Sequence, residues 1–225
     1  MKHTLKSLLT TSMLTLPSVF ATLDHLSESD TPPAAANLPH ATPQNILNTA
    51  EGLRILGNEF PVGSEKRLQF HDRSAALYEH AANLPHATPQ NILTAAHGLR
   101  IFGSLFPVGS EEGLQYHHRS AALYEHAANH PNATPKDILN AAVWLDILGT
   151  LSPECSEKRS QHHDKSAELY EHAANHPNAT PQDIQNAAYS LLNLKYKHPK
   201  GSNERIRYAT KAADLLRKHG STKQN

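Results

Sequence analysis

The sequence predicts an all-α protein, an α-solenoid of four 46-residue helix-turn-helix repeats with about eight antiparallel helices. The phrase SAALYEHAAN occupies residues 74–83 and 120–129, and it returns at 166–175 with one change, Glu168. The copies begin 46 residues apart, and a fixed period of this length is typical of units that stack because none can bury its apolar face alone. In addition, each repeat contains two segments with the start signals and the apolar spacing of helices.

The first 21 residues have the three-part layout of a secretory signal peptide. Lys2 and Lys6 precede a mostly apolar run over 8–20, and the small residues Val19 and Ala21 favour cleavage after Ala21. The run is too short to span a bilayer as a helix. An ordinary N-terminal segment is the alternative. Residues 22–35 contain two adjacent prolines and no apolar periodicity, so we interpret them as a linker.

The repeats are expected to begin at residue 36. They occupy 36–81, 82–127, 128–173 and 174–219, and residues 220–225 form a polar tail. The fourth repeat is the most divergent and the most charged in its second half, which suits a unit whose outer side has nothing to stack on. The chain has one cysteine, Cys155, so it can form no intrachain disulfide and no cysteine metal cluster.

The first helix of each repeat is expected to begin at a Thr-Pro pair. The threonine hydroxyl can accept a hydrogen bond from a free backbone N–H, and proline fits the first helical position. The four capping residues are Thr42, Thr88, Thr134 and Thr180. The apolar stripe of the first repeat is Ile46, Leu47, Ala50, Leu53 and Leu56, and the glycines expected to end the first helices are Gly57, Gly103 and Gly149.

The second helix of each repeat follows a loop that reads Phe-Pro-Val-Gly in the first two repeats. Serine can cap this helix, at Ser64, Ser110, Ser156 and Ser202. The predicted inner stripe of the first copy is Leu68, His71, Ala75, Tyr78 and Ala82. The small residues in this stripe allow neighbouring helices to approach closely.

One run of residues resembles the Sel1-like repeats, which are relatives of the tetratricopeptide repeats. The run is Ala50-x-x-Leu53-x-x-Leu56-Gly57-x-x-Phe60-x-x-Gly63, followed by Ala75-x-Leu77-Tyr78-x-x-Ala81-Ala82. The resemblance implies an adaptor with no reaction and no cofactor, whose first helices line a concave groove. The third repeat departs from the pattern at Ser152 and Cys155, and the fourth at Lys195. Because the period also suits HEAT and armadillo repeats, a generic α-solenoid is the alternative fold.

Composition and motifs exclude several classes of function. The 21 basic residues balance the 21 acidic ones, which argues against nucleic-acid binding, since that function needs a basic stripe. The sequence contains no Gly-x-Ser-x-Gly elbow and no glycine-rich phosphate loop. We therefore predict no enzyme, no catalytic residue and no cofactor, with a hydrolase as a remote alternative, and no membrane span in the mature chain.

The 17 histidines are the compositional oddity. Three equivalent ones are predicted to lie within the apolar stripe, at His71, His117 and His163, and three to point outward, at His80, His126 and His172. A metal site would use His117, His118, His162 and His163, but no further ligand completes a set, so we predict no metal and keep a His-rich periplasmic metal-binding protein as the alternative function. Inner histidines that charge together below about pH 6.5 would also loosen the stack.

The positions at which the near-identical repeats disagree point to partner binding. On the first helix these positions hold Glu51, His97, Val143 and Tyr189, followed by Gly52, Gly98, Trp144 and Ser190. Exposed apolar groups there could anchor a peptide, with Trp144 as the main anchor; the alternative is that Trp144 fills a gap between the third and fourth repeats. We expect a secreted or periplasmic adaptor that binds a protein or peptide, and a host protein is one candidate partner.

Overall fold

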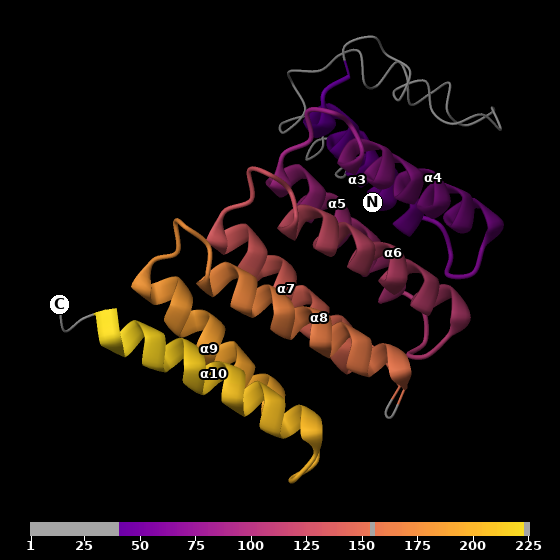
Figure 1. Cartoon of the computed structure of the whole chain (residues 1–225). Coiled ribbons are helices and arrows are strands. Elements are labelled where there is room, and N and C mark those ends of the chain that lie inside the picture. Colours follow the sequence, from indigo (N-terminus) through magenta and orange to yellow (C-terminus); the bar gives the residue numbers. More distant parts are fainter. Residues whose placement is uncertain (1–40, 154–155, 223–225) are drawn as a thin grey trace, which may run out of the picture. The chain divides into compact units, whose positions relative to one another are not determined.

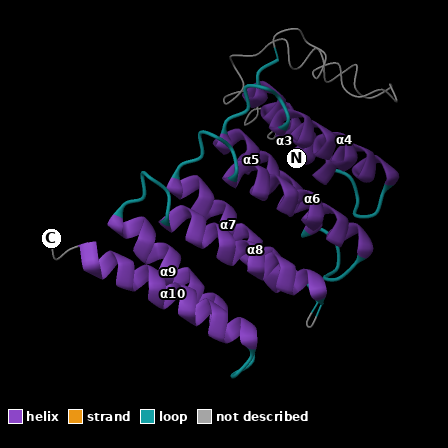
Figure 2. Ribbon diagram, in the orientation of Figure 1, coloured by secondary structure: helices purple, strands orange, loops and turns teal. Residues whose placement is uncertain are grey.

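The computed structural model describes residues 41–153 and 156–222, and within these ranges it contains eight helices and no strand (Figures 1 and 2). The predicted signal peptide, the linker, the start of the first repeat and Cys155 lie outside the described residues. The fold is an all-α helical-repeat solenoid, as predicted. The helices are α3 (Pro43–Asn58), α4 (Glu65–Ala82), α5 (Pro89–Gly103), α6 (Glu111–Ala128), α7 (Pro135–Leu151), α8 (Glu157–Ala174), α9 (Pro181–Tyr196) and α10 (Asn203–Thr222).

The predicted caps are confirmed in every repeat. Each first helix begins with an extended threonine whose side chain accepts a backbone N–H three residues on, and proline follows it. Each second helix begins after a serine whose hydroxyl accepts in the same way. The helix starts are therefore fixed locally, whatever the neighbouring repeats do. One boundary differs from the prediction, because α10 continues to Thr222, into the predicted tail.

The chain divides into two compact units, Met1–Leu77 and Tyr78–Asn225. The described part of the first unit holds α3 and most of α4. Its core contains Ile46, Leu53 and Leu77, all nearly free of solvent exposure. The buried Ser74 hydroxyl donates a hydrogen bond to the Ala50 carbonyl oxygen at 2.6 Å, which ties the second helix to the first.

The second unit holds the end of α4 and the helices α5 to α10. Helices of one repeat pack together (α5 with α6, α7 with α8, α9 with α10), and successive repeats meet through α6 with α7 and α8 with α9. The first helices also contact each other, α5 with α7 and α7 with α9. The serine tie recurs from Ser120 to Ala96 and from Ser166 to Ala142, at 2.8 Å in both cases. These three repeats are thus copies of one two-helix unit, and each copy keeps the internal serine hydrogen bond.

The predicted helix ends hold only in part. Gly103 ends α5 as predicted, whereas α3 and α7 continue one and two residues beyond Gly57 and Gly149. A Cβ added at Gly149 would lie 2.3 Å from the ring of His163, so the glycine makes space for the inner histidine of its own repeat. In the fourth repeat, Lys195 stands at the glycine position and Ala209 at the histidine position. The small residue is therefore on the second helix there instead of the first.

The predicted apolar stripes were also too long. Leu56 is 38% exposed and Leu68 is 42% exposed. The equivalents of Leu56 in later repeats are buried, and Phe102 among them packs on Tyr78 from the repeat before it, with ring centroids 6.3 Å apart. Because α3 is the first described helix, no described helix precedes it to supply such a cover. Leu68 occupies an outward position, where its equivalent Ile206 is also exposed.

Candidate functional site

The predicted partner-binding residues occupy two neighbouring positions of the first helices, and the structure separates these positions. The first position faces outward: Val143 is 41% and Tyr189 is 58% exposed, while Glu51 and His97 are half-buried. Glu51 accepts a hydrogen bond from Arg54 at 2.8 Å within α3. Residues that vary among the repeats thus lie where a partner can reach them.

The second position lies at the interface between repeats. There, each repeat of the second unit receives the buried tyrosine of the repeat before it. A Cβ at Gly98 would lie 2.4 Å from the Tyr78 ring, and the rings of Trp144 and Tyr124 stack with centroids 6.2 Å apart. In both cases the residue at the second position contacts the tyrosine of the preceding repeat: Gly98 leaves room for the Tyr78 ring, and Trp144 stacks on the Tyr124 ring.

Trp144 is half-buried and packs against the second repeat, rather than in a gap between the third and fourth. Its ring lies under the Arg100 guanidinium, 4.3 Å from centroid to Cζ, and the His97 ring meets it edge-on at 5.3 Å. The structure thus brings together two predicted residues, His97 and Trp144, and adds Arg100, which sequence reasoning missed. Burial raises the pKa of Tyr124, and the Arg100 charge opposes that rise.

Arg100 has no oppositely charged partner among the described residues, whereas the equivalent residues of the first and third repeats each form an ion pair. In the first repeat Arg54 has the Glu51 carboxylate three residues before it. In the third repeat the equivalent residue is Asp146, which accepts hydrogen bonds from Lys197 at 2.8 Å. Arg100 has His97 in place of the glutamate, with Nη2 and Nδ1 3.4 Å apart, and no carboxylate partner among the described residues. Its buried Nε has no hydrogen-bond partner there either.

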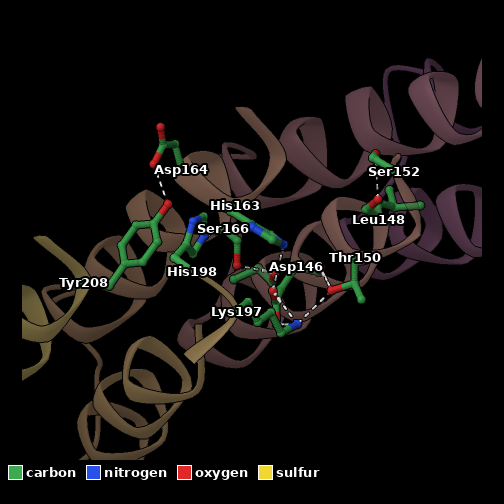
Figure 3. A network of polar contacts seen from close by, with 11 residues as sticks. Asp146, Leu148, Thr150, Ser152, His163, Asp164, Ser166, Lys197, His198 and Tyr208 are labelled. Carbon is green, nitrogen blue, oxygen red and sulfur yellow. Dashed lines mark hydrogen bonds and ion pairs between the residues drawn. The ribbon is translucent and has the colours of Figure 1, made fainter. Parts of the chain in front are cut away.

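The histidines divide as predicted between inner and outer faces. His80, His126 and His172 are exposed, whereas His71 and His163 are buried and His117 is half-buried. Figure 3 shows His163 between Asp146 and His198: its Nδ1 lies 3.1 Å from His198 Nε2, and its Nε2 lies 3.6 Å from Asp146 Oδ1. Burial lowers the pKa of His163 to about 3, and the nearby His198 and Lys197 act in the same direction.

The four histidines of the metal hypothesis do not form one set. His118 and His162 face each other across α6 and α8, with ring centroids 5.8 Å apart, and line a hollow of ≈ 420 Å³. Burial lowers the pKa of His162 to about 4, and the charges of His118 and His117 add to this effect. Over the described part of the chain, no three His, Cys, Asp or Glu side chains come together in a way that could hold a metal ion.

Ion pairs between successive second helices were also missed by sequence reasoning. A glutamate of one repeat pairs with a base 40 residues later, in Glu79–Arg119, Glu125–Lys165 and Glu171–Lys211. The three pairs recur at the repeat period, and this recurrence of opposite charges is the sequence signal that could have revealed them. They lie partly exposed along the second helices, so each contributes little to stability.

Neither the models of known protein families nor the curated proteins compared with this chain match it. Among the described helices, none is long and apolar enough to cross a membrane.

Proposed function

We propose that the protein is an exported adaptor of the Sel1-like type, which holds a partner protein or peptide against the first helices of its solenoid. One observation carries this proposal. The repeats keep most of their buried side chains, and they differ at the outward position of the first helices, where Val143 and Tyr189 expose apolar surface. Aromatic and apolar groups anchor many protein partners, so these two exposed side chains are the anchors that the proposal assigns.

The export half of the proposal depends on the N-terminal sequence, and the choice of a host protein as the partner depends on export. Sequencing the N-terminus of the protein recovered outside the cytoplasm tests this part. We expect Thr22 as the first residue, and recovery of a chain that begins at Met1 or Lys2 would contradict it.

The binding half can be tested by site-specific photocrosslinking in the mature chain. A photoreactive residue at Tyr189 should capture a defined partner, while the same group at the exposed Glu168 of α8 should not, because that site lies on a second helix. The variant Val143→Asp should abolish capture from position 189 without changing the melting temperature. Equal capture from both sites, or capture that survives Val143→Asp, would contradict the proposal.

A further inference from the structure

Arg100 is the feature of the first-helix face that the proposed function leaves unexplained. Its guanidinium is half-buried against Trp144, and a charge in such a place is normally matched by a carboxylate. The repeat before it and the repeat after it show two ways of supplying the match. Glu51 pairs with Arg54 inside the first repeat, and Lys197 pairs with Asp146 across the last interface.

Neither solution is present around Arg100. The residue three positions earlier is His97 instead of glutamate, and the position equivalent to Lys197 is Leu151. The two changes leave the guanidinium beside the His97 ring nitrogen, at 3.4 Å, and near the Tyr124 hydroxyl, with no carboxylate partner among the described residues. Exposed Val143 adjoins Trp144 in the chain, so an apolar contact lies beside the uncompensated charge.

We propose that Arg100 receives an Asp or Glu side chain of the bound partner, within an extended segment that also places an apolar residue on Val143 and Trp144. This inference rests on the proposed function and names the chemistry of its ligand. A guanidinium suits the role because it binds a carboxylate through two parallel hydrogen bonds, and Trp144 holds its plane from one side. The partner's carboxylate would neutralise the Arg100 guanidinium, as the Glu51 carboxylate neutralises that of Arg54.

The test is a selection of displayed random peptides on the full mature chain, followed by affinity measurements with the selected peptides made with blocked ends. We expect enriched sequences to carry Asp or Glu next to an apolar residue. Changing that acid to its amide should weaken binding about ten- to a hundredfold, as should Arg100→Gln. The matched control Arg54→Gln removes an arginine that already has its carboxylate and should leave affinity unchanged.

A second pair of variants separates recognition from a structural role of Arg100. His97→Glu recreates the first-repeat pair, so its carboxylate should occupy Arg100 and weaken peptide binding while the melting temperature is kept or raised. The matched control Gln90→Glu adds the same charge at an exposed position of α5, ten residues before Arg100, and should bind as the wild type does.

The outcomes distinguish the two proposals. Enriched peptides that lack an acid, or that bind His97→Glu and Arg100→Gln as tightly as the wild type, would overturn the Arg100 inference and leave the adaptor function standing. If no peptide is enriched over a selection on Val143→Asp, both proposals fail.

Discussion

Acidification should destabilise the solenoid through its buried histidines. His162 and His163 are 8% and 0% exposed, and their pKa values in the folded chain are about 4 and about 3, against 6.5 for an ordinary histidine. Because the folded values lie below the ordinary one, the unfolded chain binds more protons at mildly acid pH. Stability is therefore at its full value above pH 6.5 and falls as the pH drops from 6.5 towards the folded pKa values.

The size of the loss follows from these pKa values. At pH 5 each of the two histidines is largely neutral in the folded chain and largely charged in the unfolded one. The 1.5-unit distance from pH 6.5 corresponds to about 2 kcal/mol for each residue, so the pair should cost about 4 kcal/mol of unfolding free energy between pH 7.5 and 5. This is a large part of the stability of an ordinary domain.

Urea unfolding followed by helical circular dichroism at several pH values measures this loss. His162→Gln and His163→Gln should each reduce the pH-dependent loss by about 2 kcal/mol, whatever they do to stability at neutral pH. His172→Gln serves as the matched control because that side chain is exposed in the same helix, and it should leave the pH dependence unchanged. A wild-type stability that is flat from pH 7.5 to 5, or variants with the wild-type slope, would refute the reasoning.

Four further outcomes are expected. Gly149→Ala should lower stability by about 1–3 kcal/mol because the new Cβ would lie 2.3 Å from the His163 ring, and His163→Ala in the same chain should recover most of that loss in a double-mutant cycle. Glu125→Gln should change stability by less than about 1 kcal/mol, and raised salt should remove the difference, because the pair with Lys165 is partly exposed. Trp144→Ala should weaken partner capture and lower stability by about 2 kcal/mol with helical content kept, whereas loss of folding would indicate a purely structural role. Calorimetric titration of the mature chain with zinc should show no saturable heat, and saturable binding would favour the metal-binding alternative.

The repeat architecture could be predicted from the sequence because its determinants are local. At a Thr-Pro pair such as Thr134-Pro135, the helix begins because the threonine hydroxyl accepts a hydrogen bond from the backbone N–H three residues later. A serine caps the second helix in the same way. The period of the phrase around Ser120 shows that one packing arrangement is copied along the chain, and the serine hydrogen bond to the first helix is part of every full copy in the structure. Neither inference requires knowledge of how one repeat contacts the next.

The candidate site could be predicted only in part, since helical periodicity says which side of a helix is apolar but not what lies opposite. Val143 was correctly placed on an outward position, while its neighbour Trp144 proved to face the second repeat. Leu56 is exposed while its equivalents are buried, because no described helix precedes α3, and helical periodicity alone does not show this.

The sequence by itself determined the helices, their caps and their order, because those depend on contacts within a few residues or on a repeated phrase. Only the tertiary structure decided what Arg100 meets. Arg54 and Arg100 stand at equivalent positions in near-identical repeats, yet one pairs with a carboxylate of its own helix and the other lies on a tryptophan ring. The Arg54 pair is local and readable from the sequence, whereas Trp144 reaches Arg100 from another helix, at a distance set by how the repeats stack.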